Sequence, residues 1–252
     1  MSDASQRQPS FARRTADGGC PPHERRPMAN DLEKEAAARA SLRFVKDGQV
    51  VGLGTGSTAA YFIKLLGEQV KNGLRIRGIP TSVRSRELAL SLGIPLTSLD
   101  ECQEIAVTVD GADEVDPQLR LIKGGGGALL REKIVAAATQ QMIVVADASK
   151  QVQRLGKFPL PVEVIKFARA LVAKRITALG AEVKLRTDVD GKPYLTDENN
   201  YILDCRFGEI RDADGLAREL NGMPGVVEHG LFIGMASVAL FARGSEIEEW
   251  RR

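Results

Sequence analysis

Hydrophobic residues along this chain gather in short runs, separated by longer stretches in which apolar and polar positions recur at helical spacing. The short runs predict buried strands, at 50–53, 74–79, 94–96, 105–109 and 142–146. The amphipathic stretches between them predict helices, at 31–45, 59–70 and 84–92. Strands that alternate with helices favour right-handed βαβ units and a mainly parallel sheet, so the predicted fold class is α/β.

The pattern changes after residues 156–161, a segment with two prolines that we interpret as a domain boundary. The elements expected beyond it are a helix at 166–179, extended segments at 182–186 and 201–204, a helix at 216–220 and a strand at 226–228. This mixture, with a turn at Asp190-Gly191, predicts a small α+β domain. The apolar runs 230–233 and 237–241 are expected to rejoin the first sheet.

The predicted organisation is a larger α/β domain at 30–158, rejoined by 229–252, with the small domain at 159–228. Residues 1–29 stand apart because they are rich in Arg, Pro, Ser and Gly and lack apolar periodicity, so we expect a disordered extension. This segment contains three acidic residues and no apolar h-region, which disfavours a targeting peptide. A cytoplasmic location is therefore expected.

Composition removes several function classes. The net charge of +2 is too small to favour nucleic acid or an anionic membrane as a partner, and no apolar run is long enough to span a bilayer. Cys20, Cys102 and Cys205 are odd in number and widely spaced, so they form neither a disulfide framework nor a CxxC metal motif. His23 and His229 are the only histidines. Any catalysis is therefore expected to use carboxylates and lysines.

Such groups are concentrated in the stretch 107–133. The buried strand at 105–109 ends on Asp110, and Asp113 follows shortly after it. The next apolar stretch, 119–122, is expected to continue the sheet, and it ends on Lys123 before four glycines, 124–127. Ligands of open α/β sheets bind outside the carboxyl ends of the strands, where these residues are predicted to lie.

The loop Gly54-Thr55-Gly56-Ser57-Thr58 joins the first predicted strand to a helix. It is suited to cradle a phosphate, because glycines allow close approach and a helix N-terminus offers free N–H groups. The alternative is a tight turn capped by Ser57 or Thr58. A dinucleotide is disfavoured, because the second strand ends in Pro80-Thr81-Ser82 with no acid for a ribose, and no GxxxxGK[ST] is present.

Each candidate catalytic residue also has an ordinary structural interpretation. Asp110 and Asp113 could be turn residues, because aspartate is common in turns. A divalent metal site is disfavoured, because no His or Cys is nearby and the spacing is not that of an EF-hand. Lys123 is also compatible with a solvated position before a flexible glycine turn. Glu132 falls outside the apolar set Leu129, Leu130, Ile134 and Val135, so periodicity alone places it on a solvated face. Together, a phosphate cradle, carboxylates and a lysine suit proton transfer on a sugar phosphate.

Residues from about 31 to 241 resemble type A ribose-5-phosphate isomerases. The resemblance rests on segments in the family's order: VGLGTGSTAAYFI, GIPTSVRSRELA, VDGADEVDPQLRLIKGGGGALLREKIVA, VVADASKQVQRLGKFPLPVEV, ILDCRF and MPGVVEHGLFIGMA. It implies a Rossmann-like domain with a smaller ferredoxin-like domain and a homo-oligomer, either a dimer or a tetramer. It also implies interconversion of ribose 5-phosphate and ribulose 5-phosphate through an enediolate, without metal or cofactor.

The resemblance also implies roles for individual residues. Glu132 matches the proton-transferring base, Asp110 and Asp113 match active-site aspartates, and Lys123 matches the lysine that stabilises the enediolate oxygen. The positions implied to contact substrate are Lys34, Thr55, Gly56, Ser57, Thr58, Gly111, Ala112, Gly124, Gly125, Gly126 and Lys150. The long N-terminal extension and the charged tail SEIEEWRR depart from the family pattern, which affects location and assembly rather than the site.

Two other functions share this general architecture. A sugar-phosphate-sensing domain of a regulator should lack the Asp–Lys–Glu set and carry a helix-turn-helix, which this sequence does not show. An amino-sugar phosphate deaminase normally uses a histidine, and neither histidine lies near the stretch 107–133 in the sequence.

Overall fold

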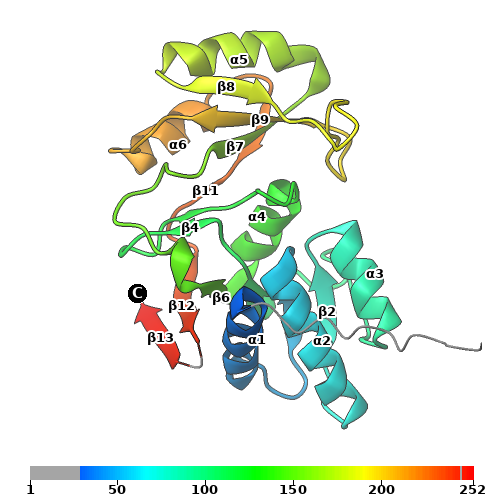
Figure 1. Ribbon diagram of the computed structural model, residues 1–252. Coiled ribbons are helices and arrows are strands. Elements are labelled where there is room, and N and C mark those ends of the chain that lie inside the picture. Colours follow the sequence, from blue (N-terminus) through cyan, green and yellow to red (C-terminus); the bar gives the residue numbers. More distant parts are fainter. Residues whose placement is uncertain (1–28, 245) are drawn as a thin grey trace, which may run out of the picture.

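The computed structural model describes residues 29–244 and 246–252 of the chain and contains one mainly parallel sheet and two antiparallel sheets (Figure 1). The prediction of disorder for the N-terminal extension concerns residues 1–28, which lie outside the described residues. Ala29, which that prediction included, begins helix α1 (Ala29–Ser41), and a 3₁₀ turn at Leu42–Phe44 follows it. No helix within the described residues is long and apolar enough to cross a membrane.

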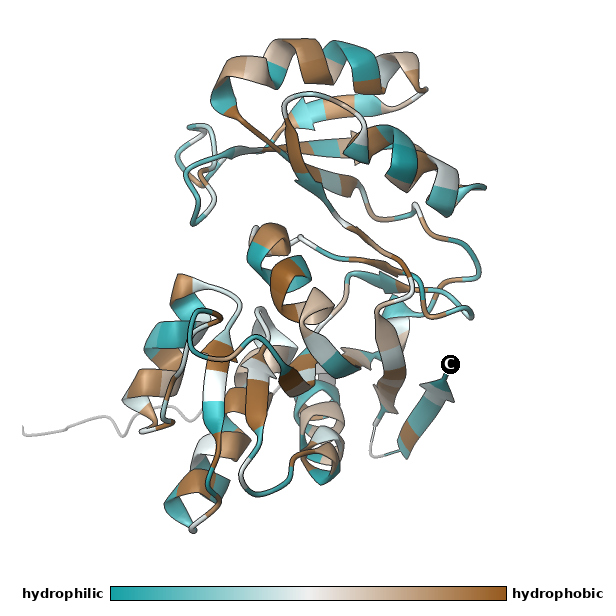
Figure 2. Cartoon of the chain, turned by 180° about the vertical axis from the view of Figure 1, so that it is seen from behind, coloured by the Kyte–Doolittle hydropathy of each residue, from teal (hydrophilic) through white to brown (hydrophobic). Residues whose placement is uncertain are grey.

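The six-stranded sheet has the order β13-β12-β6-β3-β1-β2. Its strands are β1 (Val50–Leu53), β2 (Arg77–Pro80), β3 (Ile105–Asp110), β6 (Thr139–Asp147), β12 (Ala236–Arg243) and β13 (Glu246–Arg251). All neighbouring pairs are parallel except β12 with β13. The predicted α/β class with a mainly parallel sheet is therefore confirmed. The charged C-terminal tail forms the edge strand β13, which is mostly hydrophilic (Figure 2).

Side chains that alternate along these strands form two separate cores. Val51, Leu53, Val107 and Val109 pack on one face against α1 and α2 (Ser57–Lys71). The other face, with Val144 and the neighbouring strand residues, packs against α4 (Leu129–Ala137) and a three-stranded sheet. Helix α3 (Val83–Ser91) lies beside α2 and β2 (Figure 1). Both faces are covered, which explains why the central strands β1 and β3 are almost entirely buried.

A four-stranded antiparallel sheet forms the upper part of the molecule in Figure 1. Its strands are β7 (Leu160–Val164), β8 (Glu182–Leu185), β9 (Tyr201–Arg206) and β10 (Val226–His229). Helix α5 (Arg169–Ala178), preceded by a 3₁₀ turn at Lys166–Ala168, joins β7 to β8, and α6 (Ala213–Asn221) joins β9 to β10. The strand order β10-β7-β9-β8 and the element order β-α-β-β-α-β are those of a ferredoxin-like unit. The prediction of an α+β arrangement here is confirmed.

Two sequence predictions about strands were wrong. The second strand begins at Arg77 rather than residue 74, because its partner β1 begins only at Val50, which pairs with Arg77. Residues 94–96 contribute a single bridge from Leu96 to Gly78, because Pro95 has no N–H to extend the ladder. The segment 156–161, interpreted above as a domain boundary, leads into β7, and Pro161 is tolerated there because it lies near the beginning of the strand.

A three-stranded sheet was also missed. It contains β4 (Glu114–Val115), β5 (Leu121–Ile122) and β11 (Leu231–Phe232). The stretch 119–122 does not continue the main sheet, because the Asp116 carboxylate accepts hydrogen bonds from Gln118 N and Arg120 N and turns the chain back on itself. Residues 230–233 likewise pair with β5 rather than with the first sheet, which only β12 and β13 rejoin.

Candidate active site

The carboxyl ends of β1, β3 and β6 meet at one edge of the main sheet, as the parallel pairing requires. A cavity of about 240 Å³ lies at this edge. It is lined by Lys34, Thr55, Gly56, Ser57, Thr58, Gly111, Ala112, Asp113, Lys123, Gly124, Gly126, Glu132, Asp147, Ser149 and Lys150. The structure thus brings together all the predicted site residues except two: Asp110, which is buried next to Gly111 and Lys123, and Gly125, which is exposed and contacts Asp113.

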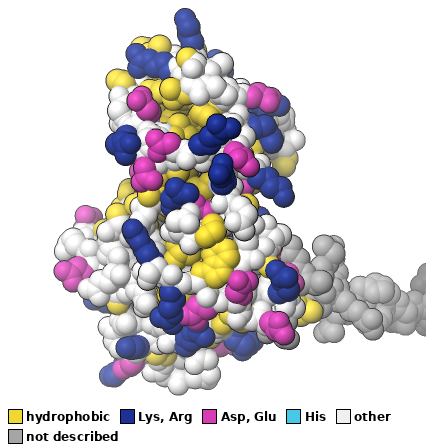
Figure 3. Space-filling view, turned by 90° about the vertical axis from the view of Figure 1, so that its left-hand side faces the viewer, with side chains coloured by type: hydrophobic (Ala, Val, Ile, Leu, Met, Phe, Trp, Pro, Cys, Tyr) yellow, Lys and Arg dark blue, Asp and Glu magenta, His cyan; other side chains and the backbone are white. Residues whose placement is uncertain are grey.

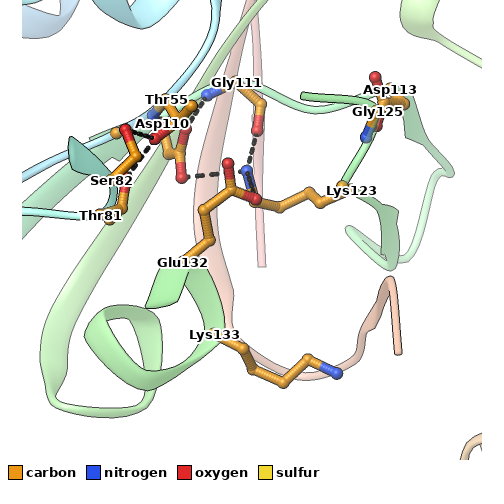
Figure 4. Close-up of polar contacts among 12 residues, drawn as sticks. Thr55, Thr81, Ser82, Asp110, Gly111, Asp113, Lys123, Gly125, Glu132 and Lys133 are labelled. Carbon is orange, nitrogen blue, oxygen red and sulfur yellow. Dashed lines mark hydrogen bonds and ion pairs between the residues drawn. The ribbon is translucent and has the colours of Figure 1, made fainter. Parts of the chain in front are cut away.

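Asp110 is the last residue of β3 and is 1% exposed. Its Oδ1 accepts hydrogen bonds from Thr55 N at 2.9 Å and Gly111 N at 2.7 Å, and its Oδ2 lies 3.0 Å from Lys123 Nζ (Figure 4). Gly54 permits this arrangement, because a Cβ there would meet Asp110 Oδ1 at 2.3 Å. Asp110 therefore joins the loop after β1 to the lysine.

Lys123 follows β5, and its side chain returns to the edge of the main sheet (Figure 4). Its Nζ lies 3.0 Å from Asp110 Oδ2 and 3.3 Å from Glu132 Oε2, and it donates a 2.5 Å hydrogen bond to Gly111 O. Burial would lower the pKa of Lys123, but the carboxylates of Asp110 and Glu132 outweigh it, so the pKa of Lys123 is raised. The lysine is therefore a permanent cation in the pocket wall.

Glu132 lies in the first turn of α4 and is 4% exposed. Burial raises the pKa of Glu132 to about 8; the Lys123 ammonium opposes this shift and the Asp110 carboxylate adds to it. Its Oε2 has no hydrogen-bond partner among the described residues, although Lys123 Nζ is 3.3 Å away. The periodicity argument was wrong here, because Glu132 faces inward while Ile134, counted in the apolar set, is 46% exposed.

The pKa of Asp110 is also raised, chiefly by burial, while Lys123 and two backbone N–H groups act in the opposite direction. One buried cation thus serves two buried carboxylates. The carboxylate with more hydrogen bonds, Asp110, is the better stabilised as an anion, and Glu132 is left as the more basic group.

Asp113 contacts the glycine run through its carboxylate. Its Oδ2 accepts a 2.7 Å hydrogen bond from Gly125 N (Figure 4). Gly124 and Gly127 have φ of 104° and 84°, a region that favours glycine. The run therefore forms a turn, closed by a hydrogen bond from Gly127 N to Gly124 O, and Gly124 and Gly126 line the cavity.

The loop after β1 begins α2 at Ser57, with Gly56 as the N-cap residue at φ 104° and without a side-chain cap. The alternative of a turn capped by Ser57 or Thr58 is therefore not what the structure shows. The Thr55 hydroxyl is within 2.7–2.8 Å of the Thr81 and Ser82 hydroxyls, which hold the loop in place. Free N–H groups of α2 consequently face a cavity that three lysines also line, Lys34, Lys123 and Lys150, an arrangement suited to a phosphate.

Asp147 and Ser149 also line the cavity and were missed as site residues. Asp147 ends β6, and its Oδ1 accepts a 3.0 Å hydrogen bond from Ser149 N. The signal for Asp147 was present in the sequence, because it ends an apolar run just as Asp110 does.

His229 lies nearer to the site stretch than the sequence suggested. Lys133, the residue after Glu132, points away from the cavity (Figure 4) and donates to His229 O at 2.6 Å and Glu228 Oε1 at 2.7 Å. Burial and then the Lys133 ammonium lower the pKa of His229 to about 4, so the ring is neutral near pH 7. His229 does not line the cavity.

The wider surroundings show neither a metal cluster nor a dominant surface charge. Within residues 29–244 and 246–252, no group of three or more His, Cys, Asp or Glu side chains is placed to hold a metal ion. On the face in Figure 3, Lys and Arg side chains are interspersed with Asp and Glu.

Comparison with known proteins gives a consistent result. A sequence model of the ribose 5-phosphate isomerase A (phosphoriboisomerase A) family matches residues 77–246. A ribose-5-phosphate isomerase A of Parvibaculum lavamentivorans is 55% identical over 230 residues, covering 88% of this chain and 100% of the relative. One from Synechococcus is 52% identical over 225 residues, covering 88% and 98%.

Two solved structures agree with this match. A D-ribose-5-phosphate isomerase in complex with phospho-erythronic acid has a TM-score of 0.87 and 42% identity, covering 89% of this chain and 100% of its own. A ribose 5-phosphate isomerase A from Methanocaldococcus jannaschii has a TM-score of 0.84, with the same identity and coverage.

Proposed function

The chain belongs to the ribose 5-phosphate isomerase A family, and on this premise we propose that it interconverts ribose 5-phosphate and ribulose 5-phosphate through an enediolate, with Glu132 as the base. It is accordingly an aldose–ketose isomerase of the pentose phosphate pathway. The observation that carries the mechanism is the ammonium of Lys123, held between Glu132 and Asp110 in the wall of the cavity.

The substrate phosphate binds at the N-terminus of α2, where Ser57, Thr58, Lys34 and Lys150 line the cavity. The sugar carbons then extend toward Glu132 and Lys123. Asp113, at the cavity surface, assists ring opening by handling the proton of a sugar hydroxyl. These placements are supported by the lining, in which Lys34 and Lys150 accompany the residues at the N-terminus of α2, and by the position of Lys123 beside Glu132.

Glu132 takes the proton from C2 of the open-chain aldose, and the electron pair of that bond moves to form the enediolate with negative charge on O1. Lys123 stabilises this oxygen, because its ammonium is permanently charged and shielded from water. The proton of O2 then moves to O1, and Glu132 returns its proton to C1 to give the ketose. A carboxyl group with a pKa of about 8 is well matched to both steps, because it can take up and release a proton near neutral pH.

Replacement of the base tests this mechanism. We expect Glu132→Gln to lower kcat by about 100-fold or more, while the affinity for phospho-erythronic acid remains within a few-fold of wild type. Glu104→Gln, at an exposed position outside the cavity lining, is the matched control and should leave kcat unchanged. In deuterated water, solvent deuterium should enter C1 of the product. Unchanged turnover of Glu132→Gln would exclude Glu132 as the base, and ligand binding without any wild-type turnover would favour a sensor.

Assembly, location and domain division are proposals of the same kind. We propose a homo-oligomer, dimer or tetramer, as the family resemblance implies, and sedimentation velocity would distinguish these states. The proposed location is the cytoplasm. The proposed domains are 30–158 with 229–252, and 159–228; the four-stranded sheet supports this division because its strands begin at Leu160 and end at His229.

A further inference from the structure

One side chain of the four-stranded sheet unit contacts the glycine run directly. Arg186, which follows β8, donates from Nη1 to Gly124 O at 2.8 Å and to Gly125 O at 3.1 Å. On the opposite side of the same peptide, Gly125 N donates to Asp113 Oδ2 at 2.7 Å. The peptide between Gly124 and Gly125 is therefore held at its carbonyl by Arg186, which follows β8 of the four-stranded sheet, and at its N–H by Asp113, which follows β3 of the main sheet.

Arg186 is itself fixed in place. Its guanidinium forms a two-pronged ion pair with Asp204 on β9, in which Nε lies 2.9 Å from Oδ2 and Nη2 contacts Oδ1. The side chain is only 13% exposed, and the ring of Tyr194 lies 6.0 Å from its guanidinium carbon. A planar group held this way presents Nη1 in one direction, which a lysine ammonium does not reproduce.

The contact determines which way the N–H groups of the run point. In a trans peptide the N–H is opposite the C=O. Because Arg186 holds the carbonyls of Gly124 and Gly125, the N–H groups of Gly125 and Gly126 point to the other side, where Asp113 receives the first. No hydrogen bond within the described residues uses Gly126 N–H, and Gly126 lines the cavity. This N–H is therefore free to donate to a substrate oxygen.

We propose that Arg186 is a positioning residue for the substrate: through the Gly124 and Gly125 carbonyls it holds the glycine run and Asp113 in the arrangement that binds the sugar part of the pentose phosphate. The inference rests on the proposed isomerase function and adds a role for the four-stranded sheet unit in it. Arg186 does not touch the reacting atoms.

The expected effect follows from the flexibility of glycine. Four consecutive glycines have many accessible conformations. Without Arg186 the run keeps only the hydrogen bond of Gly125 N to Asp113 and that of Gly127 N to Gly124 O, so the binding-competent conformation is only fractionally populated. The apparent dissociation constant then rises by the inverse of that fraction. A tenfold loss corresponds to about 1.4 kcal/mol, comparable to one hydrogen bond from a charged donor.

The test compares Arg186→Lys and Arg186→Met with wild-type enzyme. We expect Kd for phospho-erythronic acid, measured by calorimetry, and KM for ribose 5-phosphate to rise about tenfold in Arg186→Met. The inhibition constant of inorganic phosphate should stay within twofold, because phosphate alone occupies the α2 end of the cavity. Arg186→Lys should recover little of the loss, since one ammonium does not replace the fork. Lys184→Met, at an exposed lysine of β8, is the control and should change neither constant.

A general structural defect gives a different result. An unchanged Kd for phospho-erythronic acid in both Arg186 variants, or equal weakening of phospho-erythronic acid and inorganic phosphate, would overturn the proposal. If Arg186→Met does not fold, Arg186→Lys and Asp204→Asn replace it in the test, because both keep a polar side chain in the Arg186–Asp204 pair. The deciding quantity is again the change in Kd for phospho-erythronic acid relative to the change in the inhibition constant of inorganic phosphate. The proposed function is tested separately, because wild-type turnover reports on it and the ratio of variant to wild-type binding does not depend on turnover.

Discussion

The pH dependence of the isomerase is set by Glu132, which can accept a proton only when it is ionised. With a pKa of about 8, roughly one tenth of the free enzyme carries the ionised base at pH 7 and about nine tenths at pH 9. The phosphate of the substrate, with a second pKa of about 6, stays doubly ionised in this range. We therefore expect kcat/KM to rise about tenfold between pH 7 and pH 9.

Removing the charge of Asp110 should shift this profile. Asp110 Oδ2 lies 3.0 Å and Glu132 Oε2 lies 3.3 Å from Lys123 Nζ, so these two oxygens are no more than about 6.6 Å apart. At that separation two unit negative charges repel by about 2.5 kcal/mol at an effective dielectric constant of about 20. That repulsion raises the pKa of Glu132 by about two units. Asp110→Asn removes it and leaves Lys123 with one carboxylate. The inflection should therefore move toward pH 6, and the rise between pH 7 and pH 9 should nearly disappear.

The assay is the initial rate of ketose formation at substrate concentrations far below KM, in buffers of constant ionic strength. Asp47→Asn, which neutralises an exposed carboxylate that pairs with Arg75, is the control and should retain the wild-type profile. Comparison of profile shape rather than absolute rate separates the electrostatic effect from any loss of Lys123 positioning. An inflection in Asp110→Asn that stays near pH 8 or moves higher would mean that Asp110 carries no charge there, which would refute the reasoning.

Two further predictions concern stability and packing. The pKa of Glu132, about 8 against an ordinary 4.5, means that the folded state binds the proton more tightly than the unfolded chain, so stability falls as pH rises from 4.5 to 8. Glu132→Gln should therefore unfold at a higher temperature than wild type at pH 8, by about 3–6 °C, for a gain of about 1–2 kcal/mol in the free energy of unfolding. The difference in melting temperature should shrink near pH 5. A lower melting temperature of the variant at pH 8 would contradict this. Gly54→Ala should lower kcat/KM at least tenfold, because its Cβ would meet Asp110 Oδ1 at 2.3 Å and Val109 O at 2.5 Å. The control Gly222→Ala, whose nearest neighbour is Arg218 O at 3.5 Å, should remain active.

The parts of the structure that the sequence predicted are those determined by local pattern. The apolar run that ends on Asp110 identified both a strand and its carboxyl end. Because β1, β3 and β6 pair in parallel, the loops that follow them lie at one edge of the sheet. The three-stranded sheet could not be predicted in this way. Its strands are two residues long, too short for periodicity, and β11 pairs with β5 from more than a hundred residues away.

The inward position of Glu132 illustrates a second limit. Helical periodicity assigns charged residues to solvent, because burying a charge without a partner is costly. That rule does not consider a cation supplied by another element. The cation beside Glu132 is Lys123, which follows β5, whereas Glu132 lies in α4. Arg186 was missed for the same reason, because its contact with Gly124 joins residues 62 positions apart.

The number of charges in the site, rather than any single residue, explains how a carboxyl group becomes a base near neutral pH. Two carboxylates paired with two cations would both be stabilised as anions and would be poor bases. Two carboxylates without a cation would both be protonated after burial. Here one lysine serves both, and the two backbone hydrogen bonds to Asp110 Oδ1 settle which of them keeps the negative charge. The remaining carboxyl group, Glu132, has a pKa of about 8, raised first by its burial and further by the Asp110 carboxylate, so moving either the Thr55 or the Gly111 amide should change the basicity of Glu132 without touching it.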